Sequence, residues 1–369
     1  MHLSFQKVFY AIATVIGLFA ILILAKAVLI PIAFAFLIAF ILFPVTKKFE
    51  SWGVNVIMSA FLSILVLFLI IGGGIFIFSN QIIQLSENLT DFKDKILEVF
   101  AGVTMFINKN IEFLPKQEEG ALLENIKGWL NKYAGTLLSQ TVSSTADFFF
   151  GLLTVTIFAF LILIYRNGLV NAFVGFYSQE YREKAFQMFK SIQQVGQQYL
   201  FGMMVIILIL GFVNSIGLWI IGIDNPFLFG LLAAVLALIP YVGTFLGAAI
   251  PILYSIISYD SIWMPISIAV FFWLVQFIEG NFLTPKIVGG NLKINALSSI
   301  LSIIIGASVW GIAGMILFLP FTAMLKVFCE EYEELQSIAL LMGEQNYNTK
   351  DGDDKLIGKW LDNVKAWFS

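Results

Sequence analysis

Long uncharged apolar runs recur along most of this chain, and they limit its fold more than any other feature. Each run of about 20 residues can cross the roughly 30 Å hydrocarbon core of a bilayer as a helix. The chain is 59% hydrophobic and 12% charged, whereas roughly 25% of residues are charged in typical soluble domains. A bilayer accommodates this composition because it also solvates apolar side chains on the outside of a protein. The sequence therefore predicts an all-α polytopic membrane protein with about six to eight membrane spans.

The charge and the rarity of His and Cys exclude several function classes. The formal net charge of −3 is too small to indicate a nucleic-acid partner. His2 and Cys329 are single, which excludes a His/Cys metal cluster, an internal disulfide and a Cys–His dyad. The sequence contains no Walker loop, nucleophile elbow or zinc signature. We therefore expect no enzyme, no cofactor and no resident metal.

The N-terminal membrane region, residues 1–78, begins with a double-length apolar run. Residues 8–45 are uncharged except for Lys26, and Pro31 follows shortly after it. One helix of this length would reach about 57 Å, so we expect the chain to turn near Lys26 and Pro31. The start resembles a signal peptide, but its apolar core exceeds the usual length of roughly 7–15 residues. We expect an uncleaved first membrane helix.

Residues 79–147 differ from the runs around them. Charged residues alternate there with apolar ones at spacings of three and four, which is typical of amphipathic helices. We predict an extramembrane helical insert of two main segments. It either lies on the membrane helices as a solvated hairpin or serves in oligomerisation, and the sequence leaves both interpretations open.

The C-terminal membrane domain is predicted over residues 148–328 and includes a polar cytoplasmic loop, residues 166–198. The tail, residues 329–369, is soluble in character and ends in an amphipathic pattern with interspersed lysines. Such a helix suits the anionic inner leaflet, and packing onto the protein would give the same pattern.

Two stretches of this domain are too long for one span. As single helices, residues 227–259 would reach about 50 Å and residues 294–325 about 48 Å. The predicted helix breaks of this half are Pro240, Gly243, Pro285, Gly311, Gly314 and Pro320. Each stretch is either one kinked span or a re-entrant hairpin of two half-helices. We favour hairpins, because non-helical backbone at membrane depth is tolerated only where protein or water lines it.

The positive-inside rule sets the orientation. If the first five spans alternate, the basic loop residues fall on one side, which makes it cytoplasmic. These residues are Lys7, Lys47, Lys48, the basic residues of 166–198, and Lys326. Both termini are then cytoplasmic. Lys286 and Lys293 lie in the cytoplasm if both long stretches are hairpins, and outside if both cross.

The densest group of polar residues follows the apolar helix that ends near residue 278. It contains Gln276, Glu279, Asn281 and Lys286. A charge at membrane depth is costly, so it usually faces a polar cavity or a partner. We interpret Glu279 as a transport residue, with neutral hydrogen bonds from the two amides. The alternative is that Glu279 marks the interface where the chain leaves the membrane.

Two further residues complete the predicted site. Lys286 lies seven residues after Glu279 and would share its helix face, although Pro285 disfavours an unbroken helix. Tyr241 lies in the break of the first long stretch, where exposed backbone groups can bind an ion or a polar solute. A structural kink with Tyr241 packed in protein would explain the same residues.

These motifs resemble one known family. Ile239-Pro240-Tyr241-Val242-Gly243, the segment Gln276–Gly289 and the glycines and proline of 306–320 look like the AI-2E (autoinducer-2 exporter-like) transporter family. Asn295-Ala296 stands where the resemblance leads us to expect a His-Pro-like pair. The resemblance implies a bacterial cytoplasmic-membrane protein that assembles as a homo-oligomer. Some members are linked to export of the signal autoinducer-2, and others to sodium or lithium/proton antiport.

Three functional hypotheses follow. The first is a secondary transporter that exports a small polar signalling molecule, and the second is a sodium(lithium)/proton antiporter. The third is a non-transporting membrane scaffold. The expected partners are the lipid bilayer, a small polar solute or a monovalent cation and proton, and further copies of the chain.

Overall fold

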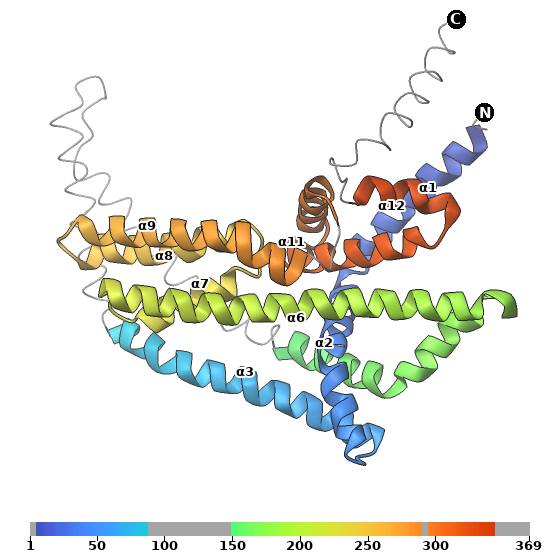
Figure 1. Cartoon of the computed structure of the whole chain (residues 1–369), viewed down its shortest axis with the longest axis horizontal. Helices are drawn as coiled ribbons and strands as arrows, with labels where there is room; N and C mark the ends of the chain where they lie inside the picture. The colour runs from blue at the N-terminus through green and yellow to red at the C-terminus, as the bar shows by residue number, and fades with distance from the viewer. Residues whose placement is uncertain (1–4, 88–148, 290–293, 344–369) are drawn as a thin grey trace, which may run out of the picture.

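The computed structural model describes residues 5–87, 149–289 and 294–343, and in these ranges the chain is almost entirely helical (Figure 1). Six of the described helices are long and apolar enough to cross a membrane. The elements are α1 (Phe5–Leu24), α2 (Lys26–Ser51), α3 (Val56–Glu87), the Phe149–Gly175 helix, α6 (Arg182–Ile221), α7 (Pro226–Leu236), α8 (Val242–Ser258), α9 (Trp263–Ile278), two π-helical segments (Glu279–Leu283 and Pro285–Gly289), α11 (Ala296–Glu330) and α12 (Gln336–Met342). The all-α polytopic fold class is confirmed.

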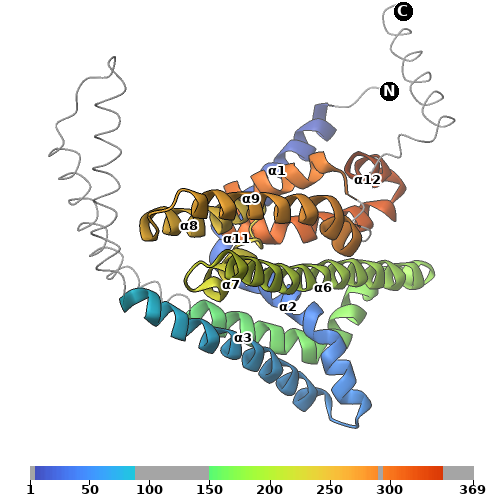
Figure 2. The same cartoon turned by 60° about the vertical axis from the view of Figure 1, so that its left-hand side comes forward.

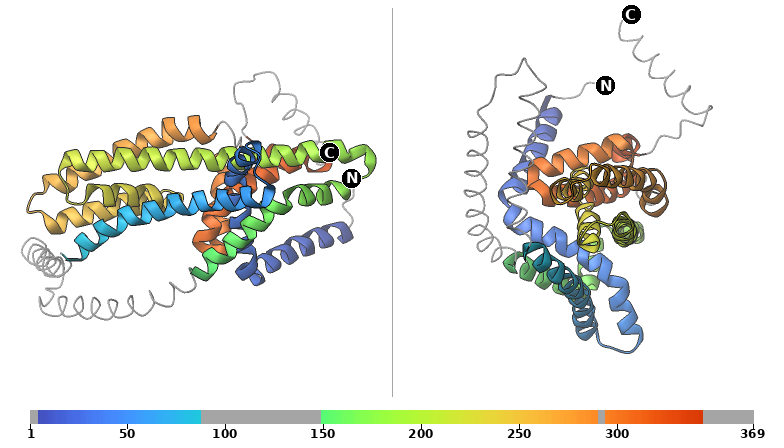
Figure 3. Two further views of the ribbon diagram at one scale, coloured as in Figure 1. Left: turned by 90° about the horizontal axis from the view of Figure 1, so that it is seen from below. Right: turned by 90° about the vertical axis from the view of Figure 1, so that its left-hand side faces the viewer.

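The first apolar run is divided at Ala25, which joins α1 to α2. Figure 3 shows the two helices meeting at a bend. The turn thus lies beside Lys26, as predicted, but Pro31 does not contribute to it. Pro31 lies inside the second turn of α2, and the helix continues past it. It leaves the Ala27 carbonyl without its helical donor, which membrane helices tolerate because neighbouring helices and local adjustments satisfy such carbonyls.

The longest described helix, α6, is the axis on which the other helices pack. Figures 1 and 2 show it running through the middle of the molecule, with α8 and α9 on one side and α3 on the other. Small residues allow close approach: a Cβ on Gly202 would lie 2.9 Å from the Ile287 carbonyl oxygen. Small residues at helix interfaces are the usual basis of packing in membranes, where no hydrophobic force drives helices together.

The first long stretch is a helical hairpin. Its arms are α7 and α8, and the rings of Phe229 and Tyr254 meet across them with centroids 4.9 Å apart. Nearer the turn, a Cβ on Gly247 would lie 3.0 Å from Ala233. At the tip, Tyr241 adopts a left-handed φ of 62°. The predicted break at Pro240 is therefore present, and it reverses the chain direction.

The second long stretch folds back in the same way within α11. Gly311 has φ 61° and ψ −137°, which is non-helical, and glycine tolerates this conformation because it has no Cβ. Beyond it, Gly314 packs directly on Gly306, and the hydroxyls of Ser302 and Thr322 lie 2.7 Å apart. The stretch is a hairpin whose tip is at Gly311.

Pro320 does not break α11, which corrects one predicted break. It lies fully buried inside the second arm, where the helix continues. Membrane helices tolerate proline because neighbouring helices and local adjustments satisfy the carbonyl that it leaves without a donor. A proline in an apolar run is therefore a weaker break signal than a glycine that must adopt a positive φ.

The polar segment 166–198, predicted as a loop, is mostly helical. The Phe149–Gly175 helix and α6 both extend into it, and the connection between them is short. Within the connection, Tyr177 bonds through its hydroxyl to the Tyr332 hydroxyl, 2.6 Å away and just after α11. Together with partial burial, this hydrogen bond raises the pKa of Tyr332 to about 12, so Tyr332 is neutral at physiological pH.

Asn295 fastens the end of the described chain to the start of α11. Its side-chain oxygen accepts from the Ser298 N–H at 2.8 Å, which caps the helix. Its side-chain amide donates to the carbonyls of Leu341 and Gly343 at 2.7 and 3.0 Å. The residue that departs from the resembled pattern therefore anchors the α12 segment.

The predicted extramembrane insert and the amphipathic tail helix lie almost wholly outside the described residues. Only the start of the insert, at the end of α3, and the tail as far as residue 343 are described.

The contact between Gly314 and Gly306 generates a stability prediction. Gly314→Ala should destabilise the protein by about 1–3 kcal/mol, because the added methyl would overlap the Gly306 backbone. We expect a lower midpoint of thermal unfolding in detergent. Gly73→Ala, on an open face of α3, is the matched control and should not lower it. An unchanged midpoint for Gly314→Ala would show that the two arms do not pack here.

Candidate functional site

The carboxylate of Glu279 lies at the end of α9 and is held by two neutral donors. Gln276 Nε2 donates to Glu279 Oε2 at 2.6 Å, and Thr284 Oγ1 donates to Glu279 Oε1. The Glu279 side chain is partly buried. The structure thus joins Gln276 to Glu279, as predicted, and adds Thr284, which the sequence analysis did not single out.

Thr284 is the partner because the helix widens after Glu279. Residues 279–283 and 285–289 are π-helical, a form with i→i+5 hydrogen bonds. The Thr284 N–H bonds to the Glu279 carbonyl five residues earlier, so the two side chains lie on the same face. The predicted break at Pro285 is therefore a widening, which accommodates a residue that has no N–H and whose ring clashes in an α-helix.

The same widening separates Glu279 from Lys286. Seven residues bring two side chains onto one face in an α-helix, but this register is lost in a π-helix. Lys286 is exposed and forms no ion pair with any described residue. The Asn281 amide is also engaged elsewhere, since its Nδ2 donates to the Phe277 carbonyl at 2.8 Å. The predicted contacts of these two residues with Glu279 are absent.

The tip of the α7–α8 hairpin satisfies its own backbone. The N–H groups of Ile239 and Gly243 donate to the carbonyls of Leu236 and Ile239, each at 2.8 Å. Pro240 has no N–H to satisfy. Tyr241 is 66% exposed, so its ring is not packed in the described part of the protein. The structural interpretation of this break required a packed ring.

The end of α7 and the helix that carries Glu279 meet on α6. Val275 and Ile287, on either side of Glu279, and Ala237 at the end of α7 pack against the same buried cluster. The same cluster contains buried Tyr199 of α6 and Leu319 from the second arm of α11. The carboxylate is thus carried by a helix that shares a cluster on α6 with both hairpins.

Three polar residues of α6 add to this region. Polar atoms of Gln197, Asn214 and Ser215 are buried without a hydrogen-bond partner among the described residues. Buried polar groups are normally paired, and unpaired ones are costly. The sequence analysis missed them, although a single asparagine inside the apolar run that begins at Tyr199 was a usable signal.

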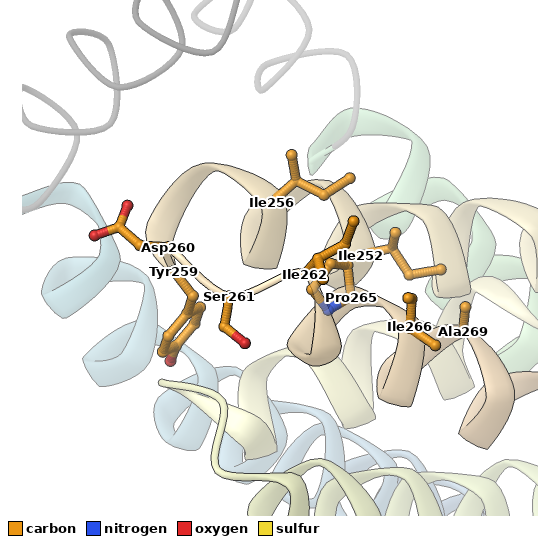
Figure 4. A pocket seen from close by; sticks show the side chains of 9 residues that line it. All are labelled: Ile252, Ile256, Tyr259, Asp260, Ser261, Ile262, Pro265, Ile266 and Ala269. Atoms are coloured by element: carbon orange, nitrogen blue, oxygen red, sulfur yellow. The ribbon is translucent and has the colours of Figure 1, made fainter. Parts of the chain in front are cut away.

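A pocket of about 560 Å³ lies where α8 turns into α9 (Figure 4). In the view, the Asp260 carboxylate is at the opposite end from Ile252 and Ala269. None of the predicted site residues lines it. Among the described residues, no group of three His, Cys, Asp or Glu side chains is arranged to hold a metal ion.

Comparison with known proteins identifies the family. Residues 12–334 match the model described as AI-2E family transporter. The chain belongs to the AI-2E transporter family. The putative transport protein YrrI of Bacillus subtilis (strain 168) is 28% identical over 82% of this chain and 86% of its own length. The AI-2 transport protein TqsA of Escherichia coli (strain K12) is 25% identical over 87% of this chain and 91% of its own. The recognised resemblance is confirmed, and the chain is a multi-pass membrane protein with a role in transport.

The contacts of Glu279 can be tested by double-mutant cycles. Glu279→Gln and Thr284→Val should be non-additive in unfolding free energy, with a coupling of about 1 kcal/mol. Thr284→Val removes the hydroxyl donor, and Glu279→Gln removes the charge that strengthens the same hydrogen bond. Unfolding of the purified protein in a denaturing detergent measures it. The control cycle of Glu279→Gln with Lys286→Met should be additive, and coupling there with none to Thr284 would contradict the π-helical register.

Proposed function

We propose that this chain is a secondary transporter that exports a small polar signalling molecule of the autoinducer-2 type across the bacterial cytoplasmic membrane. The observation that carries the proposal is Glu279, held by Gln276 and Thr284 on a helix that packs against the same α6 cluster as both hairpins. A carboxylate with neutral partners can bind a polar solute without first breaking an ion pair. The family and the name of the Escherichia coli relative support this cargo class.

The proposal gives each site residue a role in binding or moving the solute. Glu279 binds or exchanges a proton during transport, and Gln276 and Thr284 orient it. Tyr241, exposed at the tip of the first hairpin, and Lys286, which has no described ionic partner, contact the solute on its path. Asn281 contributes through its side-chain oxygen, since its amide nitrogen donates to Phe277.

We further propose that both termini are cytoplasmic and that each hairpin enters and leaves the membrane by the same face as its own start, the first from outside and the second from the cytoplasm. Ion pairs at the predicted cytoplasmic ends support this orientation. Arg166 binds Glu50, which also lies 3.2 Å from Lys47. Lys184 lies 3.9 Å from Glu331, after α11. Segments that the positive-inside rule assigns to one side are thus in contact. Following the family resemblance, we propose a homo-oligomer.

Sodium(lithium)/proton antiport is the second candidate. It is favoured by the same carboxylate, because Glu279 has no cationic partner among the described residues and can exchange a proton for a cation. The scaffold hypothesis is the weakest, because the family is described as transporters.

Transport by everted membrane vesicles tests the proposal. Vesicles that contain the wild-type protein should accumulate added autoinducer-2, since export from the cytoplasm becomes uptake. Glu279→Gln should reduce the initial rate by roughly tenfold or more, which corresponds to the loss of one hydrogen bond to a charged group. Asp260→Asn is the matched control, because its carboxylate is exposed at the α8–α9 connection, and it should retain the rate.

Other outcomes would change the account. Full uptake by Glu279→Gln would remove Glu279 from the mechanism. If the wild type takes up no autoinducer-2 but moves protons after a sodium or lithium pulse, antiport replaces export. A trapped pH dye in the same vesicles reports this second activity.

A further inference from the structure

A cavity of about 680 Å³ lies between α1, α2, α11 and α12, away from Glu279 and its partners. Its walls are almost entirely apolar side chains from the four helices. Apolar side chains that line an open cavity favour contact with other apolar groups over water, so a space of this size favours an apolar occupant.

The Trp310 indole and the hydroxyls of Ser302 and Thr322, which line the cavity, are already engaged. The Ser302 hydroxyl lies 2.6 Å from the Ser298 carbonyl oxygen and 2.7 Å from the Thr322 hydroxyl. The Trp310 indole N–H donates to the Leu22 carbonyl at 2.9 Å. A polar solute would have to leave its water without gaining these partners, which is costly. The occupant is therefore apolar, unlike the proposed cargo.

The cavity opens onto an exposed apolar surface of α1 and α11, which suits contact with the hydrocarbon of a bilayer. Leu18 and Leu301 line it and are 55% and 46% exposed, and neighbouring residues of α1 such as Ile21 are also exposed. A second copy fits this space poorly. A helix with its side chains is about 10 Å across, so 680 Å³ would hold less than two turns of one. A flexible hydrocarbon chain can enter from the bilayer and fill an irregular space.

We propose that this cavity binds an acyl chain of a membrane phospholipid. The bound chain packs α1 against the second hairpin, because Trp310 bridges to α1 and directly precedes Gly311, the non-helical residue at the hairpin tip. Lipid occupancy thereby supports the position of the tip. The proposal goes beyond the transport function and does not depend on the identity of the cargo.

Photocrosslinking tests the site with the full chain. The protein is reconstituted in phosphatidylethanolamine and phosphatidylglycerol vesicles that contain phosphatidylglycerol with a diazirine near the end of one acyl chain. After illumination, mass spectrometry locates the adducts. We expect adducts on cavity residues such as Phe318 and Leu301 in the wild type. Ile305→Trp, which fills the cavity from α11, should reduce them severalfold.

Ile304→Trp is the matched control, because Ile304 is the adjacent residue of the same type, 56% exposed and not part of the cavity wall. It should leave the adducts unchanged. Ala33→Leu, from the α2 wall, is a second and smaller filling variant, and the thermal midpoint of each variant verifies folding. Absence of cavity adducts in the wild type, or adducts that both filling variants leave unchanged, would overturn the proposal. Because the readout is binding, its failure leaves the transport function standing.

Discussion

Backbone N–H and C=O groups at membrane depth must find hydrogen-bond partners within the protein, and the two hairpins depend on this constraint. The α7–α8 tip meets it locally, through N–H bonds to carbonyls within four residues and through Pro240, which has no N–H. In α11, the change of direction is confined to one glycine, Gly311. A break that leaves so few orphan groups can lie in the apolar part of the protein.

The hairpins also need a surface to pack on, and α6 provides it. Because its glycines have no side chain, the backbone near Ile287 and side chains of α7 can approach α6 closely. The cluster around Tyr199 then joins the end of α7, the Glu279 helix and the second arm of α11. A change at one hairpin is therefore felt on the helix that carries the carboxylate. Through this shared cluster on α6, the proposed binding of a solute at Glu279 would be linked to the hairpins.

The sequence predicted the fold well wherever hydropathy and chain length decide it. The spans, the breaks at Pro240 and Gly311, and the bond from Gln276 to Glu279 could all be read from residue order. The π-helical register could not be predicted in this way, because Pro285 indicates a distortion without specifying its form. In this register Thr284, and not Lys286, is the neighbour of Glu279. Pro31 and Pro320 were predicted to turn or break a helix, and neither does. Each proline leaves one carbonyl without an N–H donor, and whether that carbonyl finds another partner depends on tertiary packing. The insert and the distal tail remain predictions.

The central proposal is that each long stretch is a hairpin that enters and leaves the membrane by a single face, and the location of Lys286 tests it most directly. A Lys286→Cys protein, with the native Cys329 replaced by Ala, is exposed in intact cells to a membrane-impermeant maleimide. The account predicts no labelling until the cytoplasmic side is opened, because two hairpins leave residue 286 in the cytoplasm. Labelling from outside in intact cells would contradict it, because the first stretch would then have to cross the membrane.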